Sequence, residues 1–327
     1  RQIEHAESIG LPLCGNMAVW TASHSNLLAL AGLTQAQASS PEALDERIRS
    51  LVGLSVSHYK DSIRHWRFHN AINTSSDSVG SMAHYSKSFS DAVAAIHDNA
   101  PDATIIAPGL MGADTNSLMR FGIPDRIGSN DWINLHTYSW GNISEPALVS
   151  DPVRKLLERS GYANPIVISH SGHDRAFPGN GVLGQTQQLA KWFGFALTQA
   201  RIQKVFFGMQ AGDRWTPVDA QSGPYPAWVA LRTLGLLLDG ADYLGPVKDG
   251  PTTFAFRFHK DDTHLILLWH DAPRPTHVRS ARDCTFVNMM DQRFPVTADS
   301  RIPVDRLPVV LFARESIEIS AWSEPDE

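Results

Sequence analysis

Two segments about a hundred residues apart carry polar side chains of the types that catalysis and binding require. Residues 64–71 read RHWRFHNA, and residues 165–172 read PIVISHSG. In each segment an apolar stretch typical of a buried parallel strand runs into a polar end. Polar and aromatic residues continue after the second of these strands, at 170–174, and follow two other predicted strands, at 136–140 and 213–215. Polar groups at the ends of several successive strands predict a site at one edge of a sheet.

Carboxylates and imidazoles in these groups suggest two kinds of chemistry. Asp174 and Asp213 form a candidate acid pair, although Arg175 and Arg214 directly beside them favour neutralised, structural carboxylates. Neutral imidazoles together with Asp174 are also zinc ligands in principle. The histidines concerned are His69, His136, His170 and His173. They lack a tight His-x-x-x-His spacing, so we predict hydrogen-bonded pocket histidines, no metal and no cofactor.

The elements that position these groups alternate between apolar strands and amphipathic helices. The predicted strands are 11–20, 63–70, 103–110, 132–138, 165–171 and 204–211. The predicted helices are 40–52, 81–99, 145–161, 184–201 and 226–239. Continuously apolar strands between helices indicate a parallel sheet covered on its faces, either doubly wound or closed into a (β/α)8 barrel. The polar residues that follow several successive strands favour the barrel.

The pattern changes near Tyr243. Short alternating segments follow, at 252–259, 264–270, 285–290 and 309–313. Period-two alternation with turn residues between the segments predicts an antiparallel β-sandwich. The sequence therefore predicts two domains, a barrel over 1–242 and a sandwich over 243–327.

Six predicted barrel strands fall short of the eight that close a (β/α)8 barrel. Their order matches strands three to eight. We expect another polypeptide, or an upstream segment of the same gene product, to supply strands one and two.

Residues 1–242 resemble clan A glycoside hydrolases, and among these they are most similar to the xylosidase and iduronidase group. The Trp-x-x-x-Asn phrase at 66–70, His-Thr-Tyr at 136–138 and the 165–172 segment carry the resemblance, with 227–232 as the last barrel helix. The C-terminal sandwich is similar to the one that those enzymes carry. The resemblance implies a (β/α)8 barrel followed by a β-sandwich.

The resemblance also implies where the catalytic groups belong. The family's general acid/base glutamate corresponds to Ala71, and its nucleophilic glutamate corresponds to His170. Asn70 matches the asparagine that holds the 2-hydroxyl of the sugar, and His136 and Tyr138 match the histidine–tyrosine pair of strand six. Both expected catalytic carboxylates are therefore replaced.

Retaining hydrolysis needs two carboxyl groups about 5 Å apart, one as the nucleophile and one as the acid. Alanine has no proton to donate, and histidine lacks the negative charge that stabilises an oxocarbenium-like centre. We therefore predict a degenerate glycosidase that acts as a carbohydrate-binding or structural subunit. An active hydrolase that uses displaced carboxylates, or that carries engineered replacements, is the alternative, and a metal-dependent enzyme on the same barrel is a third hypothesis.

Three tryptophans follow predicted strands and suit stacking on sugar rings, with ordinary rim packing as the alternative. They are Trp20, Trp140 and Trp215. Together with His69, Asn70, His136, Tyr138 and His173 they complete the predicted substrate-binding set.

Composition narrows the class of partner. The chain of 327 residues has a net charge of −6, with 43% hydrophobic and 19% charged residues. The negative balance argues against a nucleic-acid partner, and no apolar run is long enough for a membrane span. Cys14 and Cys284 fit no metal spacing and are expected to be separate buried thiols. Sequons at Asn73 and Asn142 permit secretion, and we expect an extracellular or periplasmic location.

Overall fold

The computed structural model describes residues 2–8, 13–17, 41–69, 72–73, 82–138, 144–176, 181–206, 214–219, 221, 223–249 and 252–323. The chain forms two compact units. Unit 1 comprises Arg1–Thr137, Leu148–Ser169 and Arg201–Lys204, and unit 2 comprises Tyr138–Ala147, His170–Ala200 and Val205–Glu327. The boundary at 242/243 remains a prediction.

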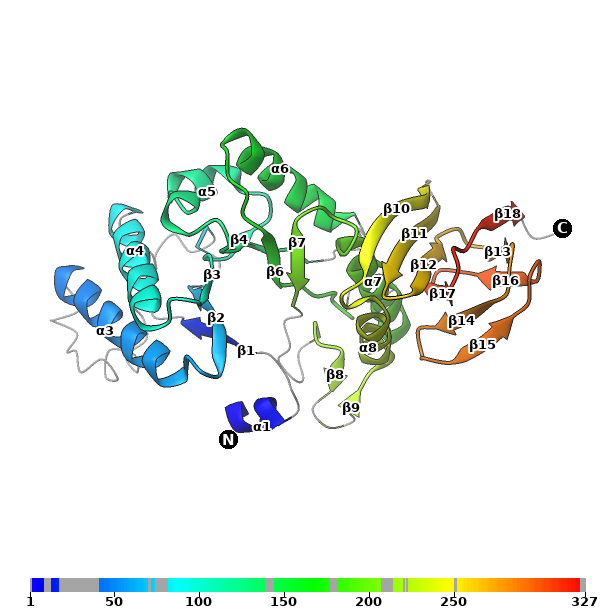
Figure 1. The fold of residues 1–327 in the computed structure, drawn as a ribbon, viewed down its shortest axis with the longest axis horizontal. Helices are drawn as coiled ribbons and strands as arrows, with labels where there is room; N and C mark the ends of the chain where they lie inside the picture. The colour runs from blue at the N-terminus through cyan, green and yellow to red at the C-terminus, as the bar shows by residue number, and fades with distance from the viewer. Residues whose placement is uncertain are drawn as a thin grey trace. The chain divides into compact units, whose positions relative to one another are not determined.

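Unit 1 is built mainly on two runs of paired strands that follow one another in chain order (Figure 1). The strands are β1 (Leu13–Met17), β2 (Ile63–Phe68), β3 (Thr104–Ile106), β4 (Leu110–Met111), β5 (Ile133–His136), β6 (Ile166–His170) and β7 (Ile202–Val205). β1, β2 and β3 pair in parallel, and β4, β5, β6 and β7 follow in that order. A parallel bridge between Ile106 and Trp132 links the two runs. In the described residues, β1 pairs with β2 alone and β7 with β6 alone.

The strand predicted at 103–110 is two short strands. β3 ends at Ile106, and β4 begins at Leu110. Pro108 lies between them, and a proline has no N–H to donate to a sheet ladder. The remaining predicted strands of this region overlap β1, β2, β5, β6 and β7.

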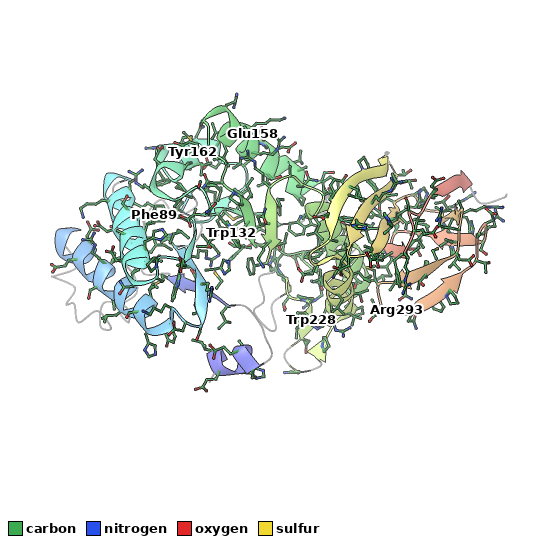
Figure 2. The ribbon with its side chains drawn as sticks, viewed as in Figure 1. Phe89, Trp132, Glu158, Tyr162, Trp228 and Arg293 are labelled. Atoms are coloured by element: carbon green, nitrogen blue, oxygen red, sulfur yellow. The ribbon has the colours of Figure 1, made fainter. Side chains whose placement is uncertain are left out.

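One face of the sheet packs on helices. They are α3 (Pro41–Tyr59), α4 (Met82–Asn99), α5 (Thr115–Arg120) and α6 (Glu145–Arg159). The short helix α1 (Gln2–Ser8) precedes β1, and the 3-10 helix η2 (Pro124–Arg126) follows α5. Trp66 and Phe68 of β2 are buried in this core. Phe89 on α4, labelled in Figure 2, stacks on Phe68 with ring centroids 6.0 Å apart. The apolar stripe of each helix therefore covers the apolar side of the strands.

The sheet of unit 1 is strongly curved. β3 and β4 occupy one position in the sheet, because β3 reaches the start of β5 through the Ile106–Trp132 bridge and β4 pairs with β5 directly. β2 and β6 are therefore three strand spacings apart, which is about 14 Å across a flat sheet. The Arg67 Nη1 on β2 nevertheless donates to the Ser169 Oγ on β6 at 2.8 Å. An arginine side chain spans that separation only if the sheet bends toward this face. Curvature of this kind is needed for a barrel, whose closure remains a prediction.

Unit 2 contains two helices that cover one face of an antiparallel sheet. They are α7 (Gly181–Ala196) and α8 (Pro226–Leu238), and a small ladder of β8 (Val218–Asp219) and β9 (Gly223–Pro224) precedes α8. Ala190 and Leu234 pack against Phe256, Leu267 and Trp269. Gly194 lies against the Leu267 side chain, so α7 approaches the sheet closely.

The sandwich consists of a six-stranded and a three-stranded antiparallel sheet, ordered β10-β11-β12-β17-β14-β15 and β16-β13-β18. The strands are β10 (Asp242–Asp249), β11 (Thr253–Lys260), β12 (Thr263–His270), β13 (Thr276–Ser280), β14 (Cys284–Asn288), β15 (Arg293–Val296), β16 (Arg301–Val304), β17 (Val309–Ala313) and β18 (Ile319–Ser323). Ile266 and Leu268 of the larger sheet share a core with Val278 and Ile302 of the smaller one. The sequence pattern missed the strands that carry charged residues or proline, such as β13 and β15.

Candidate functional site

His69 follows β2 in a backbone conformation that side chains rarely adopt. Its φ is 72°, its N–H donates to the Met17 carbonyl at 3.0 Å, and its side chain is buried. Its ring packs edge-on against Tyr85, with centroids 5.7 Å apart. A non-glycine residue at positive φ persists where its surroundings fix it, and such residues cluster at functional sites. His69 is therefore held rigidly at the end of β2.

Asn70 and Ala71 lie outside the described residues, but the chain just after them is anchored. The Ile72 N–H donates to the Gly109 carbonyl at 3.1 Å. The Asn73 amide donates to the Met111 carbonyl and to Asp114 Oδ2, and it accepts from the Met111 N–H at 2.8 Å. The sequon asparagine thus uses its amide to tie this segment to β4.

His136 ends β5 and fills space left by a glycine. It is 1% exposed, and a Cβ added at Gly109 would overlap its imidazole ring. The Gly112 N–H donates to the His136 carbonyl at 3.0 Å. Gly109, between β3 and β4, therefore limits the position of the His136 ring, and Gly112, just after β4, fixes its backbone.

Arg67 is a buried charged group on the polar side of this sheet. It is 7% exposed, and its Nε donates to Asn16 Oδ1 at 3.1 Å while its Nη1 donates to Ser169. Burial lowers the pKa of the Arg67 guanidinium. Sequence reasoning missed Arg67, although the alternation along β2 could have found it: Arg67 and His69 fall on the side opposite Trp66 and Phe68.

In unit 2, the residues after β6 pack against an aromatic pair. The Ser171 Oγ donates to the Phe206 carbonyl at 2.8 Å, next to His170 at the end of the strand. A Cβ at Gly172 would lie 3.4 Å from the Trp215 ring and 3.7 Å from Tyr138. The Tyr138 and Trp215 rings meet edge-to-face with centroids 5.3 Å apart. The structure therefore brings together Tyr138, Trp215 and the segment that follows His170.

Asp174 is neutralised by its neighbours. Its Oδ2 lies 3.1 Å from the Arg214 Nε, and its Oδ1 accepts from the Ala176 N–H at 2.8 Å. The backbone of Arg175 donates to the Arg214 carbonyl at 3.1 Å, so the two loops are joined. This arrangement is a structural ion pair rather than a free acid.

His173 lies directly beside this ion pair and is fully buried. Gln185 on α7, which the sequence did not single out, donates to the His173 carbonyl at 2.9 Å. The helix therefore fixes the backbone of this loop.

The remaining predicted site residues are outside the described part of the chain. They are Trp20, Asn70, Ala71, Trp140 and Asp213. Within the described residues, no group of three or more His, Cys, Asp or Glu side chains is placed to hold a metal ion. The described helices also include none long and apolar enough to cross a bilayer.

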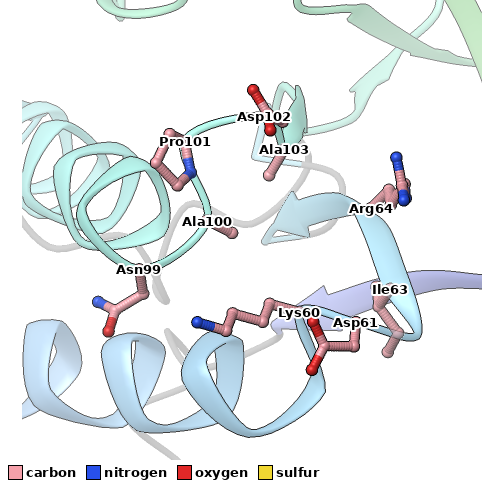
Figure 3. A pocket seen from close by; sticks show the side chains of 9 residues that line it. All are labelled: Lys60, Asp61, Ile63, Arg64, Asn99, Ala100, Pro101, Asp102 and Ala103. Carbon is pink, nitrogen blue, oxygen red and sulfur yellow. The ribbon is translucent and has the colours of Figure 1, made fainter.

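A hollow of about 330 Å³ lies at the other end of unit 1, where β2 and β3 begin (Figure 3). Its lining includes the charged side chains Lys60, Asp61, Arg64 and Asp102. In parallel barrels this end serves stability, whereas the carboxyl ends of the strands carry the chemistry. The hollow is therefore separate from the candidate site.

The search of protein-family models and the search of curated proteins both found no match. Solved structures of glycoside hydrolases do match in fold, all at low sequence identity. A family 39 glycoside hydrolase from the gut symbiont Bacteroides cellulosilyticus WH2 superposes with a TM-score of 0.67 at 14% identity, over 84% of this chain and 62% of that one. This chain thus spans less than two thirds of that enzyme.

Two further structures cover nearly the whole chain. A glucosidase from Croceicoccus marinus gives a TM-score of 0.63 at 10% identity, over 98% of this chain and 81% of that one. The family 30 subfamily 8 xylanase Xyn30A from Clostridium acetobutylicum gives 0.62 at 10% identity, over 95% and 82%. These neighbours belong to clan A, so the resemblance expected from the sequence is confirmed at the level of fold.

Proposed function

We propose that this chain, which resembles clan A glycoside hydrolases in fold, is a glycoside-hydrolase-like protein without hydrolytic activity. It serves as a carbohydrate-binding or structural subunit of a larger assembly. One observation carries the proposal: His170 ends β6 where the resemblance expects the nucleophile. Ala71 takes the place of the acid in the same comparison.

The chemistry explains why these two residues matter. Retaining hydrolysis splits into attack by a carboxylate and protonation of the leaving oxygen. General acid catalysis contributes typically about 10²–10⁴-fold, so its loss alone leaves a slow enzyme. Attack by an imidazole would give a cationic adduct and would leave the positive charge of the transition state unstabilised. Loss of both groups removes this route.

Displaced carboxylates are the alternative that needs testing. Asp174 is the carboxylate that follows β6, and it is held by Arg214 and by the Ala176 N–H. A carboxylate fixed in this way is poorly suited to attack a sugar or to donate a proton. Asp213 lies outside the described residues and stays a candidate.

Carbohydrate binding is supported by aromatic and polar groups at the strand ends. Tyr138 and Trp215 form an edge-to-face pair beside Gly172 in unit 2. His69 and His136 occupy the corresponding ends of β2 and β5 in unit 1. Aromatic faces and fixed polar groups are typical of small-molecule and sugar sites.

The two end strands of the sheet are the basis for proposing a larger assembly. β1 and β7 are its end strands in the described residues, and exposed edges of parallel sheets are normally covered. We propose that another polypeptide, or an upstream segment, pairs with these edges. We propose an extracellular or periplasmic location as well, which cell fractionation would test.

The test combines hydrolysis and binding. Aryl-glycosides with good leaving groups need no acid but still need a nucleophile, so we expect turnover at the uncatalysed rate. Glycan-array binding by the same preparation should be positive if the carbohydrate role is correct. Turnover that Asp174→Asn or Asp213→Asn abolishes would contradict the proposal and support displaced carboxylates. Turnover abolished by a chelator would support a metal-dependent enzyme.

A further inference from the structure

A buried cation in unit 1, Arg67, has neutral hydrogen-bond partners among the residues that the structure describes. Arg67 is 7% exposed, and its guanidinium donates to the Asn16 amide oxygen and the Ser169 hydroxyl. Within the described residues no carboxylate forms an ion pair with it. These two bonds use two of the five N–H donors of a guanidinium. Buried charges are normally paired, so a cation of this kind calls for an anion.

The surrounding strands offer no such anion. Strands β1, β2, β3, β4, β5, β6 and β7 contain no Asp or Glu over their described lengths. The side of the sheet that carries Arg67 also carries His65, by the alternation along β2, and His136 ends β5. Over the described lengths of these strands, this side is therefore neutral to basic.

Asp61 and Asp102 line the hollow at the opposite end of these strands, and two other carboxylates close to the strands in sequence are already engaged. Asp131 accepts from the Ile105 and Gly128 N–H groups at 2.7 Å each. Asp114 accepts from the Ser117 N–H and the Asn73 amide at 2.9 Å each. Each carboxylate thus stabilises backbone geometry instead of balancing Arg67.

A second cation, Lys204 on β7, lowers the pKa of the His65 imidazole, after the larger effect of burial. Lys204 is exposed and forms no ion pair within the described part of the chain.

We propose that Arg67 anchors an anionic group, a carboxylate or a sulfate, of an acidic saccharide bound at this side of unit 1. This inference rests on the proposed carbohydrate-binding function and names its ligand class. A planar guanidinium matches the two oxygens of a carboxylate or sulfate and forms short, charge-assisted hydrogen bonds with them. Lys204 adds longer-range attraction for the same charge.

The experiment first compares charged and uncharged ligands and then changes the cationic side chains of the protein. The whole chain is screened on an array of uronate-containing, sulfated and neutral oligosaccharides. The tightest acidic ligand is then compared by calorimetry with its methyl-esterified or desulfated form, which keeps the sugar and loses the charge. We expect the charged form to bind at least tenfold more tightly at low salt, with the difference shrinking as salt is added.

Variants then locate the charge. Arg67→Met should abolish the preference for the charged form, Arg67→Lys should retain part of it, and Lys204→Gln should reduce it. Lys155→Gln, an exposed lysine on α6, is the matched control and should leave binding unchanged. If Arg67→Met does not fold, the ligand comparison and Lys204→Gln still decide.

The outcomes separate the two proposals. Equal binding of the charged and uncharged forms, or tighter binding of neutral glycans, would overturn this inference and leave the carbohydrate-binding function intact. That result would indicate that a carboxylate of the polypeptide neutralises Arg67. An array with no binding at all would overturn the proposed function, and this inference with it.

Discussion

The backbone of Gly109 lies against the imidazole of His136, closer than any side chain at position 109 would allow. His136 is 1% exposed, so protein atoms enclose its ring. The glycine between β3 and β4 therefore sets the position of the histidine that ends β5. Overpacking at such a site usually destabilises by about 1–3 kcal/mol.

We predict that Gly109→Ala lowers the free energy of unfolding by roughly 1–3 kcal/mol and weakens saccharide binding. Gly235→Ala is the matched control, because Gly235 lies inside α8 with no atom within 4 Å of the added Cβ. That control should gain up to about 1 kcal/mol from helix propensity. Chemical denaturation of both variants checks the prediction, and a neutral Gly109→Ala would show that His136 moves freely.

The sequence predicts the parallel strands and their helices because apolar periodicity reports burial directly. It locates His69, His136 and His170 at strand ends for the same reason. The alternation along β2 gives the side on which Arg67 lies, but it does not predict the hydrogen bond to Ser169, which depends on the curvature that brings β2 close to β6. Curvature arises from the packing of the whole sheet, and no local pattern within β2 encodes it.

The sandwich shows a similar limit. β11 and β12 are rich in apolar residues, so the pattern finds them. β15 has the sequence Arg-Phe-Pro-Val and lies at the edge of its sheet, where proline is tolerated. Its strand conformation depends on pairing with β14, which the residues of β15 alone do not reveal.

A buried ion pair in unit 2 gives a stability prediction. Lys191 on α7 is 2% exposed and pairs with Asp271, which is 29% exposed and also accepts from the Trp269 indole at 3.3 Å. Burial lowers the pKa of Lys191, while Asp271 opposes that shift. The lysine therefore depends on its partner more than the aspartate does.

We predict that Asp271→Asn destabilises by about 3–5 kcal/mol, because it leaves a buried ammonium without a counter-charge. Lys191→Met should cost less, since Asp271 reaches water. The double variant should be more stable than Asp271→Asn alone. Urea denaturation of all three variants measures these differences, and a smaller loss in Asp271→Asn than in Lys191→Met would contradict the argument.

The pKa of His65 gives a pH prediction. Burial lowers it most, and the charge of Lys204 lowers it further. Because the folded pKa lies below that of the unfolded chain, about 6.5, the unfolded state takes up the proton first as pH falls. The contribution of His65 to stability is therefore present above that value and is lost as pH falls toward the folded pKa.

We predict that Lys204→Gln raises the His65 pKa, measured by NMR titration of its ring protons. Lys155→Gln should leave that pKa unchanged. The loss of stability on the acid side should also become smaller in Lys204→Gln. An unchanged His65 pKa in Lys204→Gln would show that burial alone sets the shift and that Lys204 lies too far away to act.

Restoring the carboxylates tests the assignment of the catalytic positions. In His170→Glu, a nucleophile returns without an acid, so aryl-glycosides with good leaving groups should turn over slowly, and azide should accelerate the reaction by attacking the glycosyl-enzyme. Ala71→Glu alone should remain inactive, because an acid without a nucleophile forms no intermediate. The double variant should exceed His170→Glu by roughly 10²–10⁴-fold on substrates with poor leaving groups, where protonation matters most. Release of the aryl group by each variant is the measurement, and a double variant as inactive as the native chain, with its saccharide binding intact, would show that Ala71 and His170 do not occupy the catalytic positions.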